Sequence, residues 1–440
     1  MTTDARGNPV STTDASALEL FEQALHQYQS FVGDAVATIE RALAARPDFV
    51  LGHLFRAGVL MTFGEQRFAA AARDSVRAAE PLAGAANDRE RALLAAIRRL
   101  VDGDWHGACS ALDRVLVDHP RDAFAIQTAH LFDFFRGDAA NLRNRITRVL
   151  PGWSARVPGY SYILGMHAFG LEECNQYAEA RATAERALAL EPRDGWAVHA
   201  VVHVLEMQGL VEDGVHWLES RQRDWAPDNA FAFHNWWHLA LFHLDRGDVR
   251  RVLELFDTAI YPEPSSDLSF PLVDASALLW RLFLQGIDVG ARAARIAAAW
   301  EPKLEAERGF YAFNDIHALL AFVMAGREDA SRAVLRDLEA TTGAHANAAM
   351  AREVGLPVAR GILAFAAGHH DRALAELEPV RDIAHRFGGS HAQRDLLTLT
   401  IIEAALRGAR PSVARHYLAE RNVQRPGSAL GWRLHARATS

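Results

Sequence analysis

A repeat of 34 residues is the feature of this sequence that most restricts its fold. Residues 161–194 form one unit, and residues 195–228 follow directly as a second unit of the same length. Glycines recur where the turn between two helices of a unit is expected, at Gly137, Gly209 and Gly247 among others. Self-similarity at a period of about 20 to 50 residues indicates units that pack on their sequence neighbours, not separate globular domains.

Each unit is expected to be a pair of helices. Alanine, leucine and arginine are abundant and no alternating β-branched runs occur, which favours helix. Small residues where the paired helices meet, such as Ala168 and Ala180, together with the period of 34 match the tetratricopeptide pattern. The expected units start near residues 16, 50, 89, 123, 161, 195, 233, 272, 312, 354 and 394.

We therefore predict an all-α protein, a right-handed α-solenoid of about ten to eleven tetratricopeptide-like helical hairpins. It is expected to form a single domain over residues 16–424. Residues 1–15 are expected to be a flexible N-terminus and residues 425–440 a loosely held C-terminal tail.

Charge and cysteine content narrow the partners and the compartment. The chain carries 47 lysines and arginines against 55 aspartates and glutamates, a net charge of −8, with both signs interspersed. This pattern argues against nucleic acid as the main partner, which would require a concentrated basic face. No apolar stretch approaches the ~18 residues that span a bilayer, so no membrane association is expected. Cys109 and Cys174 have no CxxC spacing, and a reducing cytoplasm is the expected compartment.

Histidines and aromatic residues concentrate on the first helices of the central units. First-helix positions 2, 5, 9 and 12 are expected to line the concave surface, since residues three and four apart share one side of a helix. Aromatic walls around a few polar groups are typical of a small-molecule pocket, although the aromatic residues would equally pack against a neighbouring hairpin. The unusual residues on or beside this stripe are Trp196, His199, His203, Glu206, His234, Trp237, His238 and Trp280.

Three interpretations of the histidines stay open. They would bridge neighbouring helices by hydrogen bonds, or bind a divalent metal, or carry out acid–base chemistry without a metal. For a metal, His199 and His203 are four residues apart on a helix, and Glu206 or His234 would supply a third ligand. For acid–base chemistry, Glu206 would fix the tautomer of His203, and His199 or His234 would face the ligand.

Several blocks of the chain resemble the family of proteins related to tetratricopeptide repeat protein 38. The blocks are Trp196–Gly209, His234–Phe242, Asp274–Leu282, Asn314–His317 and Gly389–Asp395, all within residues 160–421. The resemblance implies the repeat solenoid and no settled reaction. It adds candidate substrate-binding residues beside the central histidines: Asp274, Asp315, His317, Arg394 and Asp395.

The sequence favours a protein that binds a small molecule in a closed concave pocket and transforms it by hydrolysis, elimination or isomerisation. The expected catalytic residues are His199, His203, Glu206 and His234, and no cofactor is required unless a divalent metal is bound. The alternative is a non-catalytic scaffold that receives a peptide segment of a protein partner in its groove. Lysine, arginine and asparagine, which would clamp a peptide carboxylate, are absent from the central stripe.

Overall fold

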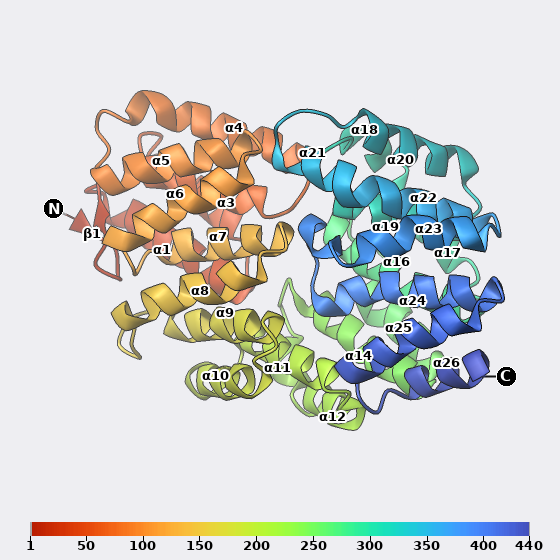
Figure 1. Cartoon of the computed structure of the whole chain (residues 1–440). Helices are drawn as coiled ribbons and strands as arrows, with labels where there is room; N and C mark the ends of the chain where they lie inside the picture. Colours follow the sequence, from red (N-terminus) through yellow and green to blue (C-terminus); the bar gives the residue numbers. More distant parts are fainter. Residues whose placement is uncertain (1, 440) are drawn as a thin grey trace. The chain divides into compact units, whose positions relative to one another are not determined.

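The computed structural model describes residues 2–439, and helices dominate this part of the chain (Figure 1). The helices assemble as antiparallel pairs, so the predicted all-α solenoid of helical hairpins is confirmed. By contact the chain divides into two compact units. Unit 1 comprises Met1–Val201 and Arg223–Ala232, and unit 2 comprises Val202–Gln222 and Phe233–Ser440. The single domain over residues 16–424 stays a prediction, because the structure describes each unit by itself.

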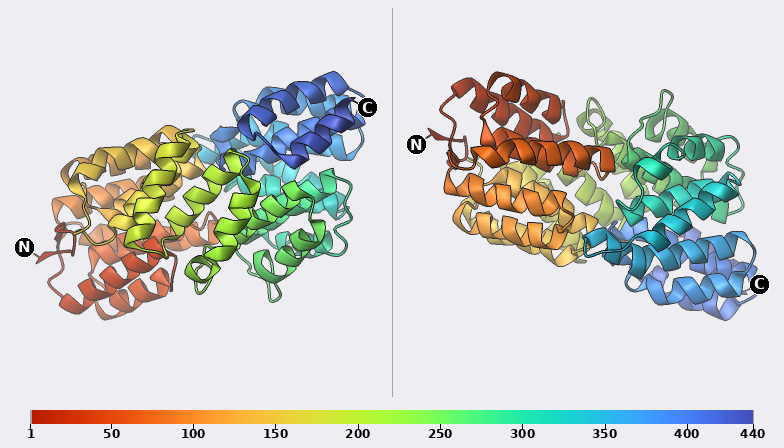
Figure 2. Two further views of the ribbon diagram at one scale, coloured as in Figure 1. Left: turned by 90° about the horizontal axis from the view of Figure 1, so that it is seen from below. Right: turned by 90° about the horizontal axis from the view of Figure 1, so that it is seen from above.

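Unit 1 is a row of helical hairpins (Figure 2). Its pairs are α1 (Ala15–Ser30) with α2 (Ala35–Ala45), α3 (Val50–Met61) with α4 (Gln66–Ala79), α5 (Asp88–Val101) with α6 (Trp105–Asp118), α7 (Ala123–Phe135) with α8 (Ala139–Val149), and α9 (Tyr160–Glu173) with α10 (Tyr177–Leu190). Short 3₁₀ turns follow α4 and α8, at Glu80–Leu82 and Leu150–Gly152. The helix α11 (Gly195–Met207) begins in unit 1 and ends in unit 2.

Unit 2 continues the same plan with more irregular helices. Its helices are α12 (Val211–Ser220), α14 (Ala232–Arg246), α15 (Val249–Leu255), α16 (Ser269–Leu284), α17 (Arg292–Trp300), α18 (Lys303–Ala306), α19 (Ala312–Met324), α20 (Glu328–Ala340), α21 (Ala346–Met350), α22 (Leu356–Ala366), α23 (His370–Arg381), α24 (His391–Arg407), α25 (Pro411–Gln424) and α26 (Ala429–Thr439). The short α13 (Gln222–Trp225) precedes α14, and Ala384–Phe387 forms a 3₁₀ turn before α24. Single π-helical turns follow α15, at Phe256–Ile260, and α21, at Ala351–Gly355.

The predicted unit starts agree with the structure, with one exception. Ten of the first helices begin within three residues of the expected position, for example α3 at Val50 and α19 at Ala312. The exception is the unit expected at residue 354, where helix already begins at Ala346 and runs through a π-helical turn into α22. The first helix of this hairpin is therefore about two turns longer than the repeat pattern predicts.

The first helices of the hairpins form the interior of each unit. In α16, 14 of 16 residues are buried, as expected for a helix that is apolar on every side. Within unit 2, α16 packs against α24: the Trp280 Nε1 donates to Thr400 Oγ1 at 3.0 Å, and Arg281 Nη2 donates to the carbonyl oxygen of Ala392 at 2.8 Å. Unit 2 therefore curls until first helices more than 100 residues apart touch.

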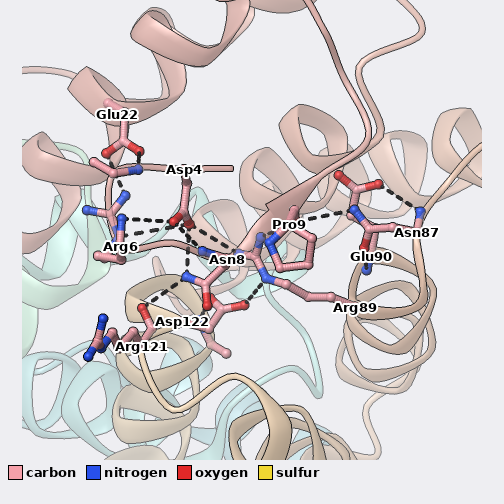
Figure 3. A network of polar contacts seen from close by, with 12 residues as sticks. Asp4, Arg6, Asn8, Pro9, Glu22, Asn87, Arg89, Glu90, Arg121 and Asp122 are labelled. Carbon is pink, nitrogen blue, oxygen red and sulfur yellow. Dashed lines mark hydrogen bonds and ion pairs between the residues drawn. The ribbon is translucent and has the colours of Figure 1, made fainter. Parts of the chain in front are cut away.

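The N-terminal segment differs from the prediction of a flexible end. Strand β1 (Thr2–Thr3) pairs antiparallel with β2 (Pro9–Val10), and the loop between them places Asp4, Arg6 and Asn8 in the interior (Figure 3). Arg89 of α5 donates to Asp122 at 2.7 Å and to the carbonyl oxygen of Pro9 at 2.9 Å. The segment supplies a hydrogen-bond partner to this buried arginine, which accounts for its polar composition. The same polar composition is typical of a loose terminus, and for that reason the sequence predicts a flexible end.

The C-terminal residues also differ from the predicted tail. Residues 429–439 form α26, which packs on α25, and the hydroxyl of Ser428 donates to Asp245 Oδ2 at 2.5 Å. Arg425 is buried. Among residues 2–439, no helix combines the length and apolar character needed to cross a membrane.

We predict that Arg89→Met destabilises unit 1 by about 3–5 kcal/mol, because it leaves the buried carboxylate of Asp122 without its cationic partner. Urea denaturation of the variant and the wild type measures the change. Arg91→Ala on the same helix is the matched control, since its ion pair with Asp88 is solvent-exposed and contributes little. Equal loss in both variants would show that Arg89 is not the residue holding the N-terminal segment.

Candidate functional site

The candidate site is a buried cluster of histidines and carboxylates in unit 2. His203 and Glu206 lie on the last turns of α11, and His234 and His238 lie one turn apart on α14. All four are buried, with His203 and His238 fully so. Gly209, which ends α11 with a φ of +68°, allows the carbonyl of Pro426 to approach closer than any side chain would permit. This approach positions the segment after α25 beside the end of α11.

Two of the histidines are held by carboxylates from neighbouring helices. His234 Nδ1 lies 2.6 Å from Asp274 Oδ2 of α16, and His238 Nδ1 lies 2.7 Å from Glu206 Oε2 of α11. The ring of His238 lies 4.6 Å from that of His203 and 4.8 Å from that of His234. A carboxylate at Nδ1 places the proton of a neutral imidazole there and directs the lone pair of Nε2 to the other side of the ring. The predicted pairing of Glu206 with His203 is thus replaced by a bond to His238.

Glu206 uses its second oxygen for the C-terminal segment. Arg425 Nη1 donates to Glu206 Oε1 at 2.6 Å, and Arg425 also lies 3.8 Å from Asp395 of α24. Arg421 donates to both oxygens of Asp395 at 2.9 Å. The cluster is therefore one polar network that joins α11, α14, α24 and α25 through the interior of unit 2.

Arg281 brings a third guanidinium into the same interior. It donates to the backbone carbonyls of Ala277 at 2.9 Å and Ala392 at 2.8 Å, and its guanidinium lies over the ring of Trp237 at 5.3 Å. Burial lowers its pKa to about 10, so Arg281 stays protonated at neutral pH. The carbonyl oxygens that accept from Arg281 carry no formal charge. The negative charges that interact with its guanidinium are those of Asp395 and Glu206, at longer range.

The environment favours neutral histidine and ionised carboxylate in this network. Burial lowers the pKa of His238 well below its ordinary value, and the positive charges of neighbouring groups, including Arg425 and Arg281, lower it further. Burial would raise the pKa of Asp395, but Arg421 and Arg425 hold it below its ordinary value. The result is a neutral imidazole at His238 and an ionised carboxylate at Asp395 within one network.

The structure divides the remaining predicted site residues between the two units. In unit 1, Trp196 packs on Phe31 and His130, and the ring of His199 lies 5.2 Å from that of Phe169. In unit 2, Trp237 stacks on His234 at 5.2 Å. Of the three tryptophans predicted to form a pocket wall, Trp196 thus belongs to unit 1, and Trp237 and Trp280 belong to unit 2. Trp280 serves the packing of α16 on α24.

The residues added by the family resemblance have separate roles. Asp274 and Asp395 belong to the network described above. His317 donates from Nδ1 to the carbonyl of Phe313 at 2.7 Å, and burial lowers its pKa to about 4. Arg394 donates to the carbonyl of Gly389 within its own helix start. Asp315 is half-buried on α19.

The predicted closed pocket is not supported by the cavity of unit 2. The best-defined pocket measures about 10 Å³ and is lined by residues of α16, α24 and α26, among them Arg281 and Glu403. A space of this size holds about one water molecule. This pocket is too small for an organic substrate, and none of the clustered histidines lines it.

Sequence reasoning missed the three arginines that balance the network. Arg281 lies in the block Asp274–Leu282, where it falls on the same side of the helix as Asp274, seven residues earlier. That spacing was an available signal. Arg425 gives no such signal because it falls in the predicted tail, and Arg421 gives none because its partner Asp395 lies 26 residues away.

No protein-family model matches the chain. Among solved structures, the chain is similar to the human IFIT1 dimer at 14% identity over 97% of this chain and 95% of that one, with a TM-score of 0.45. It is similar to yeast Tom70 at 11% identity over 93% and 90%, with a TM-score of 0.41. A third likeness is to the APC/C hetero-tetramer Cut9-Hcn1, at 12% identity over 96% and 76%, with a TM-score of 0.41. At these values the similarities say nothing about what this chain binds.

We predict that Glu206→Ala destabilises unit 2 by about 3 kcal/mol or more, because it leaves the buried guanidinium of Arg425 without its shorter ion pair. Glu206→Gln, which keeps an acceptor but removes the charge, should lose less. Chemical denaturation followed by circular dichroism gives both values. The exposed pair of Glu212 with Arg246 supplies the control variant Glu212→Ala, expected to change little. A loss no larger than in this control would contradict the bridging role of Glu206.

The raised pKa of Asp315 leads us to predict that the stability of the protein depends on pH. Burial and the nearby carboxylates of Asp337 and Glu307 raise its pKa to about 8, above the value of about 3.9 in an unfolded chain. The folded state therefore binds this proton more tightly, and its contribution to stability is lost as the pH rises toward 8. Asp315→Asn should raise the free energy of unfolding relative to the wild type at pH 9 more than at pH 5.

Urea denaturation of wild type and Asp315→Asn at the two pH values tests this. The variant Asp329→Asn, on the exposed start of α20 in the same hairpin, should show no such increase with pH. A difference between Asp315→Asn and wild type that is the same at pH 5 and pH 9 would mean that Asp315 is ionised throughout.

Proposed function

We propose that the protein is a helical-repeat scaffold that binds a peptide segment of a protein partner. The observation that supports this is the occupied interior of unit 2. The histidines that would serve a substrate are bonded across helices to Glu206 and Asp274, and the best-defined pocket holds about one water molecule. A ligand must then bind to an outer surface. A repeat protein offers such surfaces in proportion to its length.

Acid–base catalysis on a small substrate has weaker support. A general base must lie within hydrogen-bond reach of a substrate proton. In unit 2, His234 and His238 instead direct one ring nitrogen each to a carboxylate. The resemblance to proteins related to tetratricopeptide repeat protein 38 implies no particular reaction, so it does not favour catalysis over peptide binding.

The surface that we propose for the partner is the outer side of α25 and α26, at the C-terminal end of unit 2 (Figure 2). Two large apolar side chains are exposed there on either side of one short turn: Val423 is 81% exposed and Trp432 is 66% exposed. The terminal helix of a repeat protein ordinarily has a polar outer face. Tryptophan is also among the residues that contribute most to binding energy in interfaces.

The charge of this surface indicates an acidic partner. Helix α26 contains no acidic residue. Arg433 donates to the backbone carbonyls of Asp245 and Leu244, and Arg415 of α25 donates to that of Ala438. Both arginines are exposed, and these bonds do not neutralise their charge. The chemistry that fits is an apolar anchor residue flanked by aspartate or glutamate.

We expect acidic peptides with one leucine or aromatic anchor to bind the wild-type chain and to bind Trp432→Ser at least about 30-fold more weakly, which corresponds to about 2 kcal/mol. A peptide array followed by fluorescence anisotropy on the best peptides gives the affinities. Val423→Ser should weaken binding in the same direction.

Val117→Ser is the matched control, because Val117 is an equally exposed valine (79%) on α6 of unit 1. It should leave peptide affinity unchanged. Peptides that bind the wild type and Trp432→Ser equally well, or no binding by any acidic peptide, would contradict the proposed surface.

A further inference from the structure

Three of the histidines in unit 2 are arranged so that their ring nitrogens converge. His203, His234 and His238 each offer one nitrogen, and these atoms lie within 4.8 Å of one another. We propose that these three histidines bind one divalent transition-metal ion of the zinc class, which joins the end of α11 to α14. This site is additional to the peptide surface on α25 and α26, and neither depends on the other.

The distances suit a metal after a small adjustment. A tetrahedral zinc ion bonds to histidine nitrogen at about 2.0–2.1 Å, so its ligand atoms lie about 3.4 Å apart. Nitrogens within 4.8 Å of one another need to close by about 1 Å or less per side chain, which rotation of an imidazole ring supplies. Two of the ligands come from one turn of α14, where residues four apart share a face.

The hydrogen bonds at the far side of the rings are those of metal-binding histidines. A histidine that ligates a metal usually donates its other ring N–H to a carboxylate or carbonyl, which fixes the tautomer and strengthens the ligand. His234 is bonded in this way to Asp274 at 2.6 Å, and His238 to Glu206 at 2.7 Å. With Nδ1 bonded to a carboxylate, Nε2 is the nitrogen through which each of these rings would bind a metal.

The charge state of the cluster also suits a cation. Asp274 and Glu206 contribute negative charge directly behind the ligands. The opposing charges of Arg281 and Arg425 face Asp395 and Glu206, so the network as a whole carries as many carboxylates as guanidiniums.

The donor set selects the kind of ion. Imidazole nitrogen suits zinc, copper, nickel and cobalt, whereas magnesium and calcium require oxygen ligands. The sequence-based metal hypothesis named Glu206 as a ligand, but its oxygens are bonded to His238 and Arg425. It acts here as the carboxylate behind a ligand. The enclosed position gives the ion a structural role, that of fixing two inner helices.

The test is metal binding by the full chain. Protein freed of metal by chelation is titrated with Co²⁺ and with Zn²⁺, and bound metal is counted by elemental analysis after desalting. We expect one ion per chain, visible-region d–d absorption of tetrahedral Co²⁺ with nitrogen ligands, and a higher melting temperature with Zn²⁺. His238→Gln and His203→Gln should each retain less than a tenth of the bound metal.

Two further variants separate binding from folding. His317→Gln is the matched control, because His317 is equally buried in unit 2 but is not one of the three converging histidines; it should keep one ion per chain. Asp274→Asn keeps all three ligands and should weaken zinc affinity about 10- to 100-fold. A wild-type chain that binds neither ion, or that binds it equally in His238→Gln and His317→Gln, would overturn the site.

Discussion

Both oxygens of Glu206 are committed, and the interior of unit 2 depends on this. One oxygen accepts from His238 on the neighbouring inner helix, and the other accepts from Arg425, which follows α25. A carboxylate buried at this depth is stable only when its lone pairs meet donors. The same requirement extends outward, since Arg425 faces Asp395 and Asp395 holds Arg421. Repeat packing brings the helices together, and this chain of charges determines which helices face one another.

Unit 1 meets a similar requirement at its other end. Arg89 is buried beside Asp122, and its Nη1 donates to the backbone carbonyl of Pro9 in the N-terminal segment. In both units a polar terminal segment, outside the regular hairpins, supplies partners to charged groups in the interior. Terminal repeats of solenoids need caps because their outer faces lack a neighbour. Here the caps also complete hydrogen bonding inside the units.

The hairpins could be predicted from the sequence because the signal repeats. Small residues such as Ala168 and Ala180, and glycines such as Gly209, recur at fixed intervals, and the helix starts followed to within three residues in all units but one. The histidine cluster was identified on the same register, and Glu206 with it. The hydrogen bonds and ion pairs of the cluster could not be predicted, because the repeat period does not indicate which distant hairpins touch. Arg425 lies 219 residues from Glu206, and no local pattern relates two such positions.

That separation has a consequence for how the chain is made. A ribosome adds Glu206 and His238 to the chain long before it adds Arg425 and α26. Until then the nascent unit 2 contains a carboxylate whose cationic partner does not yet exist, so its inner helices have no complete polar interior to close around. Domains generally fold as units during synthesis, and the N-terminal hairpins of unit 1 can do so. In unit 2 the polar interior around Glu206 cannot be completed until Arg425 has been synthesised.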